Sequence, residues 1–90
     1  MQATKIDYDT QARKVGLIVG ISEEIYFCSL SHVSTVYVER IDDHWECWRE
    51  NYIPNMNRRK KYKVLASGEF DYVIARTKNY LKYMKSLRRD

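Results

Sequence analysis

The cysteines and histidines are the residues of this chain whose types suit metal binding or nucleophilic chemistry. Cys28, His32, His44 and Cys47 follow a Cys-x3-His-x11-His-x2-Cys order, which formally supplies four zinc ligands. Structural zinc sites usually contain short Cys-x2-Cys knuckles, and this chain has none. Cysteine within a strand is more often a small buried apolar residue. We therefore expect no metal and keep these four residues as a minor zinc alternative.

The chain also lacks the sequence patterns of common catalytic sites. Its three glycines, Gly16, Gly20 and Gly68, are too scattered for a phosphate-binding loop, and no G-x-S-x-G elbow occurs. A cysteine and a histidine could act as nucleophile and base, but any chain with two of each residue contains such a pair, so the pair alone does not indicate a catalytic site. A domain of 90 residues has little room for both a core and a substrate cleft. We expect no enzymatic activity and no cofactor.

Positive charge is concentrated in the last third of the sequence. Residues 1–57 hold five Lys/Arg against nine Asp/Glu, a net charge of −4, whereas residues 58–90 hold eleven against three, a net charge of +8. Clustered cations can neutralise phosphates and release their counterions, although a solvated helix face is often rich in lysine without any partner. The alternative function is thus binding of RNA, DNA or another polyanion by Arg58, Arg59, Lys60, Lys61, Lys63, Lys78, Lys82, Lys85 and Arg89.

Two other groups of residues suit protein binding. Tyr72, Arg76, Asn79 and Tyr83 recur at helical spacing, and exposed Tyr and Arg are enriched at protein–protein hot spots. Trp45 and Trp48 lie in a hairpin among five acids, which predicts an acidic and aromatic knob that docks on a basic surface; the acids are Glu39, Asp42, Asp43, Glu46 and Glu50. Acids at a turn also guard a sheet edge against aggregation, which is the simpler interpretation.

The elements that must position these residues are mostly strands, within residues 5–66. Residues 14–30 read as a hairpin around a turn at residues 22–24, and residues 32–52 as a second hairpin around Asp42 and Asp43. Pro54 ends that hairpin, residues 55–61 read as a loop, and residues 62–66 add a strand. A short strand over residues 5–9 and a turn over residues 9–12 precede them.

A C-terminal helix is predicted over about residues 68–88, with Ser67 as its N-terminal cap. Its apolar residues fall on one stripe at about 100° per residue, which indicates a face that packs on the sheet. The members of that stripe are Phe70, Val73, Ile74, Thr77, Leu81 and Met84.

The expected fold is therefore α+β and a single domain over residues 1–90. A four- or five-stranded antiparallel sheet, built from two hairpins, carries one C-terminal amphipathic helix across one face, and the other face stays open to a partner. The aromatic motif of the RNA-recognition fold is absent. The double-stranded-RNA domain needs a helix before its three-stranded sheet, and residues 1–14 do not indicate one.

These features favour a non-enzymatic, macromolecule-binding module. We expect a small inhibitor or adaptor that occupies a functional surface of another protein or of a protein–nucleic-acid complex; small accessory proteins of phages and mobile elements offer an analogy. A homodimer is a further option, because the acidic hairpin could meet the basic helix of a second copy. With two cysteines, no signal peptide and no apolar run of membrane-spanning length, we expect a cytoplasmic protein.

Overall fold

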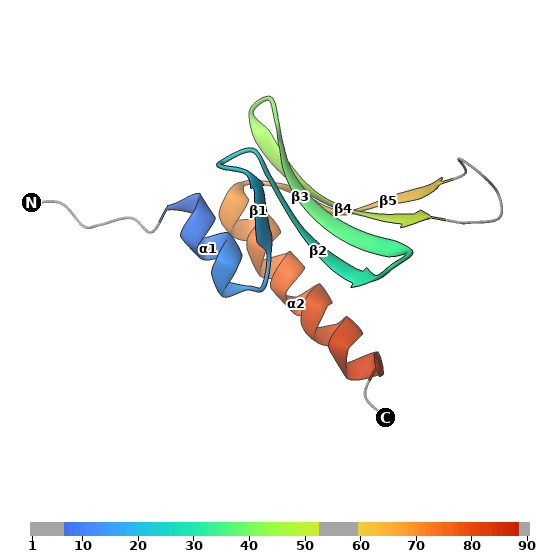
Figure 1. Ribbon diagram of the computed structural model, residues 1–90. Helices are drawn as coiled ribbons and strands as arrows, with labels where there is room; N and C mark the ends of the chain where they lie inside the picture. Colours follow the sequence, from blue (N-terminus) through green and yellow to red (C-terminus); the bar gives the residue numbers. More distant parts are fainter. Residues whose placement is uncertain (1–6, 53–59, 89–90) are drawn as a thin grey trace, which may run out of the picture.

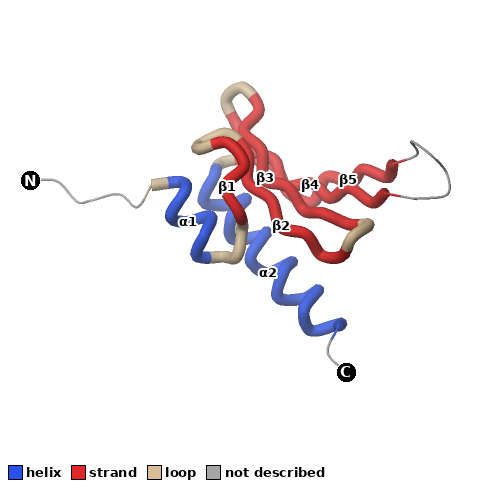
Figure 2. Tube along the Cα trace, in the orientation of Figure 1, coloured by secondary structure: helices blue, strands red, loops and turns tan. Residues whose placement is uncertain are grey.

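The computed structural model describes residues 7–52 and 60–88, which form a five-stranded antiparallel sheet and two helices (Figure 1). The strands follow one another in the order β1-β2-β3-β4-β5, so each pairs with its neighbour in the sequence. Both helices lie on the same face of this sheet (Figure 2). The α+β fold with a C-terminal helix on the sheet is confirmed, and the sheet has five strands. The strands are β1 (Ile18–Ile21), β2 (Ile25–Ser31), β3 (Ser34–Ile41), β4 (His44–Tyr52) and β5 (Lys60–Gly68), and the helices are α1 (Tyr8–Lys14) and α2 (Phe70–Arg88).

The turn between β3 and β4 lies where the sequence predicts it. Ile41 pairs directly with His44, so Asp42 and Asp43 form a two-residue connection. Asp42 adopts a φ of 55°, in the left-handed region that short hairpin turns require and that aspartate tolerates better than most residues. The acidic pair is therefore explained by turn geometry.

Strand β5 is longer than residues 62–66, and this changes where α2 begins. It pairs with β4 from Lys60 to Gly68, and Ser67 lies opposite Glu46 within the ladder. The prediction that Ser67 caps the helix is therefore wrong, because its backbone belongs to the sheet. Helix α2 begins at Phe70, and the Glu69 carbonyl accepts a hydrogen bond of 2.9 Å from the Val73 amide.

The pairing of β4 with β5 contains an irregularity that affects which side chains share a face. Cys47 lies opposite Ala66, whereas Trp48, the next residue, lies opposite Val64. Leu65 is therefore an extra residue in β5, as in a β-bulge. Leu65 packs against the core, and Val64 keeps its place across from Trp48.

Residues 8–14 form helix α1, so the short strand expected at residues 5–9 and the turn expected at residues 9–12 are wrong where the structure describes them. Residues 5 and 6 lie outside the described residues. Asp7 caps α1, since its Oδ1 accepts a hydrogen bond of 3.0 Å from the Thr10 amide. With this helix, the stated reason for excluding a double-stranded-RNA domain is wrong. The five strands still differ from the three of that domain.

Asp9 fastens α1 to the turn between β1 and β2. Its carboxylate accepts hydrogen bonds from the Tyr26 hydroxyl at 2.6 Å, the Ser22 hydroxyl at 2.6 Å and the Glu23 amide at 3.1 Å. The hydroxyls of Ser22 and Tyr26 hold the pKa of Asp9 below its ordinary value. Tyr26 is fully buried, and its pKa is raised by burial and then by the Asp9 carboxylate.

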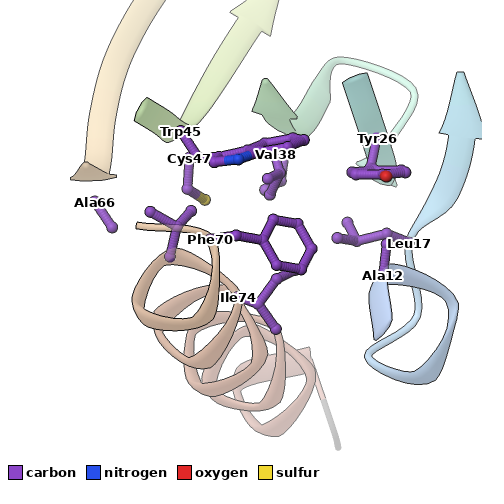
Figure 3. Packing of buried hydrophobic residues seen from close by; sticks show 11 residues of the cluster. Ala12, Leu17, Tyr26, Val38, Trp45, Cys47, Ala66, Phe70 and Ile74 are labelled. Atoms are coloured by element: carbon purple, nitrogen blue, oxygen red, sulfur yellow. The ribbon is translucent and has the colours of Figure 1, made fainter. Parts of the chain in front are cut away.

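The core lies between the sheet and the two helices (Figure 3). Alternate residues of β2, β3 and β4 point to this inner face, because successive side chains of a strand face opposite sides. Phe70 from α2 meets the Trp45 ring edge-on, with ring centroids 4.8 Å apart, and Ala12 adds α1 to the same cluster. The buried apolar residues are Ala12, Leu17, Tyr26, Val36, Val38, Trp45, Cys47, Ala66, Phe70, Val73 and Ile74.

The predicted apolar stripe of α2 contacts this core along most of its length. Phe70, Val73, Ile74 and Thr77 are buried, while Leu81 and Met84 are half-buried. A polar contact adds to the packing: the Arg49 guanidinium on β4 donates to the Tyr80 hydroxyl. Within the described residues, neither helix is long and apolar enough to cross a membrane.

We predict that Tyr26→Phe lowers the free energy of unfolding by about 1 kcal/mol, because it keeps the buried ring but removes the hydrogen bond that the hydroxyl donates to Asp9 and the one that it accepts from the Glu23 amide. Urea unfolding followed by circular dichroism measures the change. Tyr83→Phe is the matched control, since that side chain is exposed on α2. Equal stability of Tyr26→Phe and the wild type would contradict a stabilising role for the Asp9 contact.

Acid should weaken the attachment of α1. The pKa of Asp9 is lower in the folded chain than its ordinary value of 3.8, so the unfolded chain binds a proton first as the pH falls. The stabilisation is complete above that ordinary value and is lost as the pH falls through the folded-state pKa. Between about pH 5 and pH 2 the wild type should lose more stability than Asp9→Asn, in urea titrations at each pH. Parallel losses would contradict the assignment.

Candidate functional site

The outer face of the sheet, opposite the helices, carries a row of apolar side chains. Phe27, Tyr37, Trp48 and Val64 are successive cross-strand partners on β2, β3, β4 and β5, and Ile18 on β1 pairs with Phe27. The row therefore crosses all five strands. We call these five residues the outer row.

The outer row is both ordered and accessible. The rings of Tyr37 and Trp48 stack with centroids 4.3 Å apart and an interplanar angle of 21°, and Phe27 lies beside Tyr37 at 6.4 Å. The two ends of the row are exposed, Ile18 by 56% and Val64 by 44%. No described helix covers this face (Figure 1). The arrangement offers apolar contact area whose aromatic rings are already held in place.

Glutamates frame the outer row. Trp48 Nε1 donates to Glu39 Oε1 at 3.2 Å, and the Tyr37 hydroxyl lies 3.4 Å from Glu50 Oε1. Glu39 is also the direct cross-strand partner of Glu46. Like charges directly opposite each other in a sheet are unfavourable, so a cation bound between them would be favoured.

His44 lies at the edge of this acidic frame and carries a positive charge when its imidazole is protonated. Its Nε2 lies 3.5 Å from Glu46 Oε2, and its Nδ1 lies 3.4 Å from Asp43 Oδ1. Hydrogen bonds with Glu46 and then with Asp43 raise the pKa of His44. The negative charge of the frame therefore decreases as the pH falls toward the mildly acidic range.

The acidic and aromatic knob predicted around the two tryptophans is divided between the two faces of the sheet. Trp48 belongs to the outer row, but Trp45 is 4% exposed and packs against Phe70 in the core. The prediction of Trp45 as a protein-binding residue is therefore wrong. The two tryptophans are three positions apart, and residues an odd number apart in a regular strand face opposite sides.

The four residues of α2 that were predicted to bind protein form a strip that faces solvent. Tyr72 and Tyr83 are 50% and 58% exposed, and Arg76 and Asn79 are also exposed. Arg76 Nη1 donates to the Tyr72 hydroxyl at 3.0 Å, with the guanidinium 5.8 Å from the ring centroid. This strip lies on the side of α2 away from the sheet, so it is separate from the outer row.

The predicted polyanion-binding lysines of α2, Lys78, Lys82 and Lys85, are joined by a lysine from the other helix. Lys14, at the end of α1, lines a hollow of about 190 Å³ together with Lys78, Lys82 and Lys85. None of these four lysines forms an ion pair with a carboxylate of the described residues. The sequence pattern did not reveal Lys14, because it is more than sixty positions away from the α2 lysines.

The remaining predicted cations are divided between strand β5 and segments outside the described residues. Lys60 and Lys61 belong to strand β5, so the prediction of a loop at residues 55–61 is wrong for these two residues. Lys63 is exposed on the same strand, opposite Arg49. Arg58, Arg59 and Arg89, together with Pro54, lie outside the described residues.

The four candidate zinc ligands are not brought together. His32 lies in the turn before β3, and His44 begins β4 at the opposite end of β3. The two histidines are therefore far apart, because a strand of eight residues spans about 26 Å. Cys28 and Cys47 lie on the two strands that flank β3. No group of three or more possible metal ligands occurs among the described residues. The zinc alternative is therefore not supported.

A cleft of about 290 Å³ lies near the start of α2, but the side chain of Arg40 already packs over the aromatic rings that line it. The Arg40 guanidinium lies 6.0 Å from the Tyr8 ring centroid and 5.7 Å from the Trp45 ring centroid. Three carboxylates also line the cleft, those of Asp43, Glu69 and Asp71. We assign no binding role to this cleft.

Comparisons of the chain with protein-family models, with curated proteins and with solved structures found no match.

The two free thiols should differ strongly in reactivity. Cys47 is 1% exposed and burial raises its pKa, whereas Cys28 is only half-buried. Because the thiolate is the reactive form, an excess of iodoacetamide should modify Cys28 in the native protein and Cys47 only after unfolding, as followed by mass spectrometry. Cys47→Ser should leave the fast reaction intact. Equal rates at both thiols would contradict the burial of Cys47.

Proposed function

We propose that the protein is a non-enzymatic protein-binding module that docks through the outer face of its sheet. The observation that carries this proposal is the outer row itself, an apolar stripe across five strands on the face that no described helix covers. Exposed apolar patches on small proteins commonly mark interaction sites. By occupying a surface of its partner, such a module acts as an inhibitor or an adaptor.

The side chains of the outer row suit an interface. Tyr and Trp are enriched at hot spots, and Tyr37 and Trp48 already stack on each other. A side chain that is ordered before binding loses less conformational entropy when the complex forms. The stacked pair can therefore contribute binding energy at a low entropic cost.

The charges around the row indicate the chemistry of the partner. Glu39, Glu46 and Glu50 surround the aromatic pair, and the first two lie opposite each other. A partner surface with Lys or Arg around an apolar centre would relieve their repulsion and speed up association. We therefore propose a protein partner with a basic surface, within a reducing cytoplasmic compartment that keeps both cysteines as free thiols.

This proposal predicts that outer-face variants lose the partner and helix-face variants keep it. A photo-crosslinking residue at position 64 should capture a partner in the source cell that the same residue at position 72 does not. With that partner purified, Trp48→Ala should raise the Kd about 30-fold and Glu46→Lys about tenfold, measured by isothermal titration calorimetry.

Tyr83→Ala is the matched control and should change the Kd by less than about twofold, because Tyr83 faces solvent on α2. Circular dichroism checks that each variant is folded, and Glu46→Lys serves if Trp48→Ala is not. A partner whose affinity depends on Tyr83 and not on Glu46 or Trp48 would overturn the assignment of the outer face.

A further inference from the structure

A groove on the opposite side of the molecule combines an apolar floor with a rim of lysines. Two adjoining hollows, of about 190 and 180 Å³, share Val15, Leu81 and Lys85 in their walls. They lie between the end of α1, strand β2 and the C-terminal half of α2. We call the pair the lysine groove.

The floor of the lysine groove is aliphatic and partly accessible. Val15 follows α1, Leu30 comes from β2, and Leu81 and Met84 come from α2. All four side chains are half-buried, so they reach the edge of the core without being covered. A partner could therefore bury further apolar surface here.

The rim of the groove carries positive charge that the described residues do not neutralise. Lys14, Lys78, Lys82 and Lys85 are exposed, and no carboxylate is among the residues that line the two hollows. The four ammonium groups come from two helices that contact each other. Their mutual repulsion would fall when an anionic group binds between them.

We propose that the lysine groove binds an acidic amphipathic segment of a partner protein. A helix or extended segment of this kind places apolar side chains in the hollows while its carboxylates meet the lysines, as in other helix-in-groove complexes. This site goes beyond the docking of the outer sheet face, since it has the opposite charge and a different set of residues. With both sites, the protein can link two partners.

The lining of the groove favours a protein segment over nucleic acid. Proteins that bind single strands stack the bases on aromatic rings, and the residues that line the two hollows include neither an aromatic ring nor an arginine. Four lysines around an aliphatic floor instead match the two kinds of side chain in an acidic amphipathic peptide. The same lysines could still attract phosphates, so nucleic acid is tested directly.

The test measures fluorescence polarisation with a labelled helical peptide whose leucines recur every third or fourth residue among glutamates. The unmodified protein should bind it, and Lys78→Glu with Lys82→Glu should raise the Kd at least tenfold. Met84→Gln, which makes the floor polar without changing the charge, should weaken binding about as much. A peptide of the same composition in scrambled order should bind at least tenfold more weakly.

Two control variants separate this site from other effects. Lys63→Glu reverses one lysine charge on β5, outside the groove, and should change the Kd by less than about twofold. Glu46→Lys, on the outer face, should also leave peptide binding intact. The proposed docking face and the lysine groove can thus fail independently.

Four results would overturn the proposal. Equal binding of the scrambled peptide, or an equal loss in Lys63→Glu, would show that net charge alone attracts the peptide. Tighter binding of an RNA or DNA oligonucleotide that the Lys78 and Lys82 variant abolishes would assign the lysines to nucleic acid. Self-association in analytical ultracentrifugation that the same variant abolishes would assign the groove to a second copy.

Discussion

The carboxylate of Asp9 joins the short helix α1 to the rest of the molecule, and much of the surface depends on that attachment. It binds the buried Tyr26 hydroxyl and two groups of the turn between β1 and β2. A helix of seven residues is not stable alone in water, so it needs such tertiary contacts. With α1 in place, Ala12 closes the core and Lys14 reaches the lysines of α2.

The sheet separates two surfaces of opposite character through the alternation of its side chains. Outward residues of β3 and β4 supply the outer row and its glutamates, while inward residues pack against α1 and α2. The extra residue Leu65 preserves this arrangement at β5, because it keeps Val64 opposite Trp48 and still sends Leu65 and Ala66 toward the core. If β5 paired with β4 without this bulge, Leu65 would lie opposite Trp48, and the faces of the preceding part of the strand would be reversed.

The sequence predicted the elements with strong periodicity and missed those that depend on long-range contacts. The C-terminal helix and the Asp42–Asp43 turn were evident from spacing and turn chemistry. Helix α1 was missed because seven residues give too little periodicity, and β5 extends past Ser67 because β4 continues to pair with it. Of the candidate site, the α2 strip, the α2 lysines, Trp48 and an open sheet face were predictable from the sequence. Lys14 and the other four members of the outer row were not, since tertiary packing brings Lys14 to α2 and strand register aligns the row.

The sequential pairing of the strands has a consequence for synthesis on the ribosome. Each strand can pair with its predecessor as soon as it emerges, so most contacts of the sheet are local and favour rapid folding. The inner face is different, because Phe70, Val73 and Ile74 cover it only after β5 has been made. Until then, Trp45, Val36 and Val38 would be open to water, and this nascent intermediate is the stage at which the chain would be most prone to aggregate or to need a chaperone.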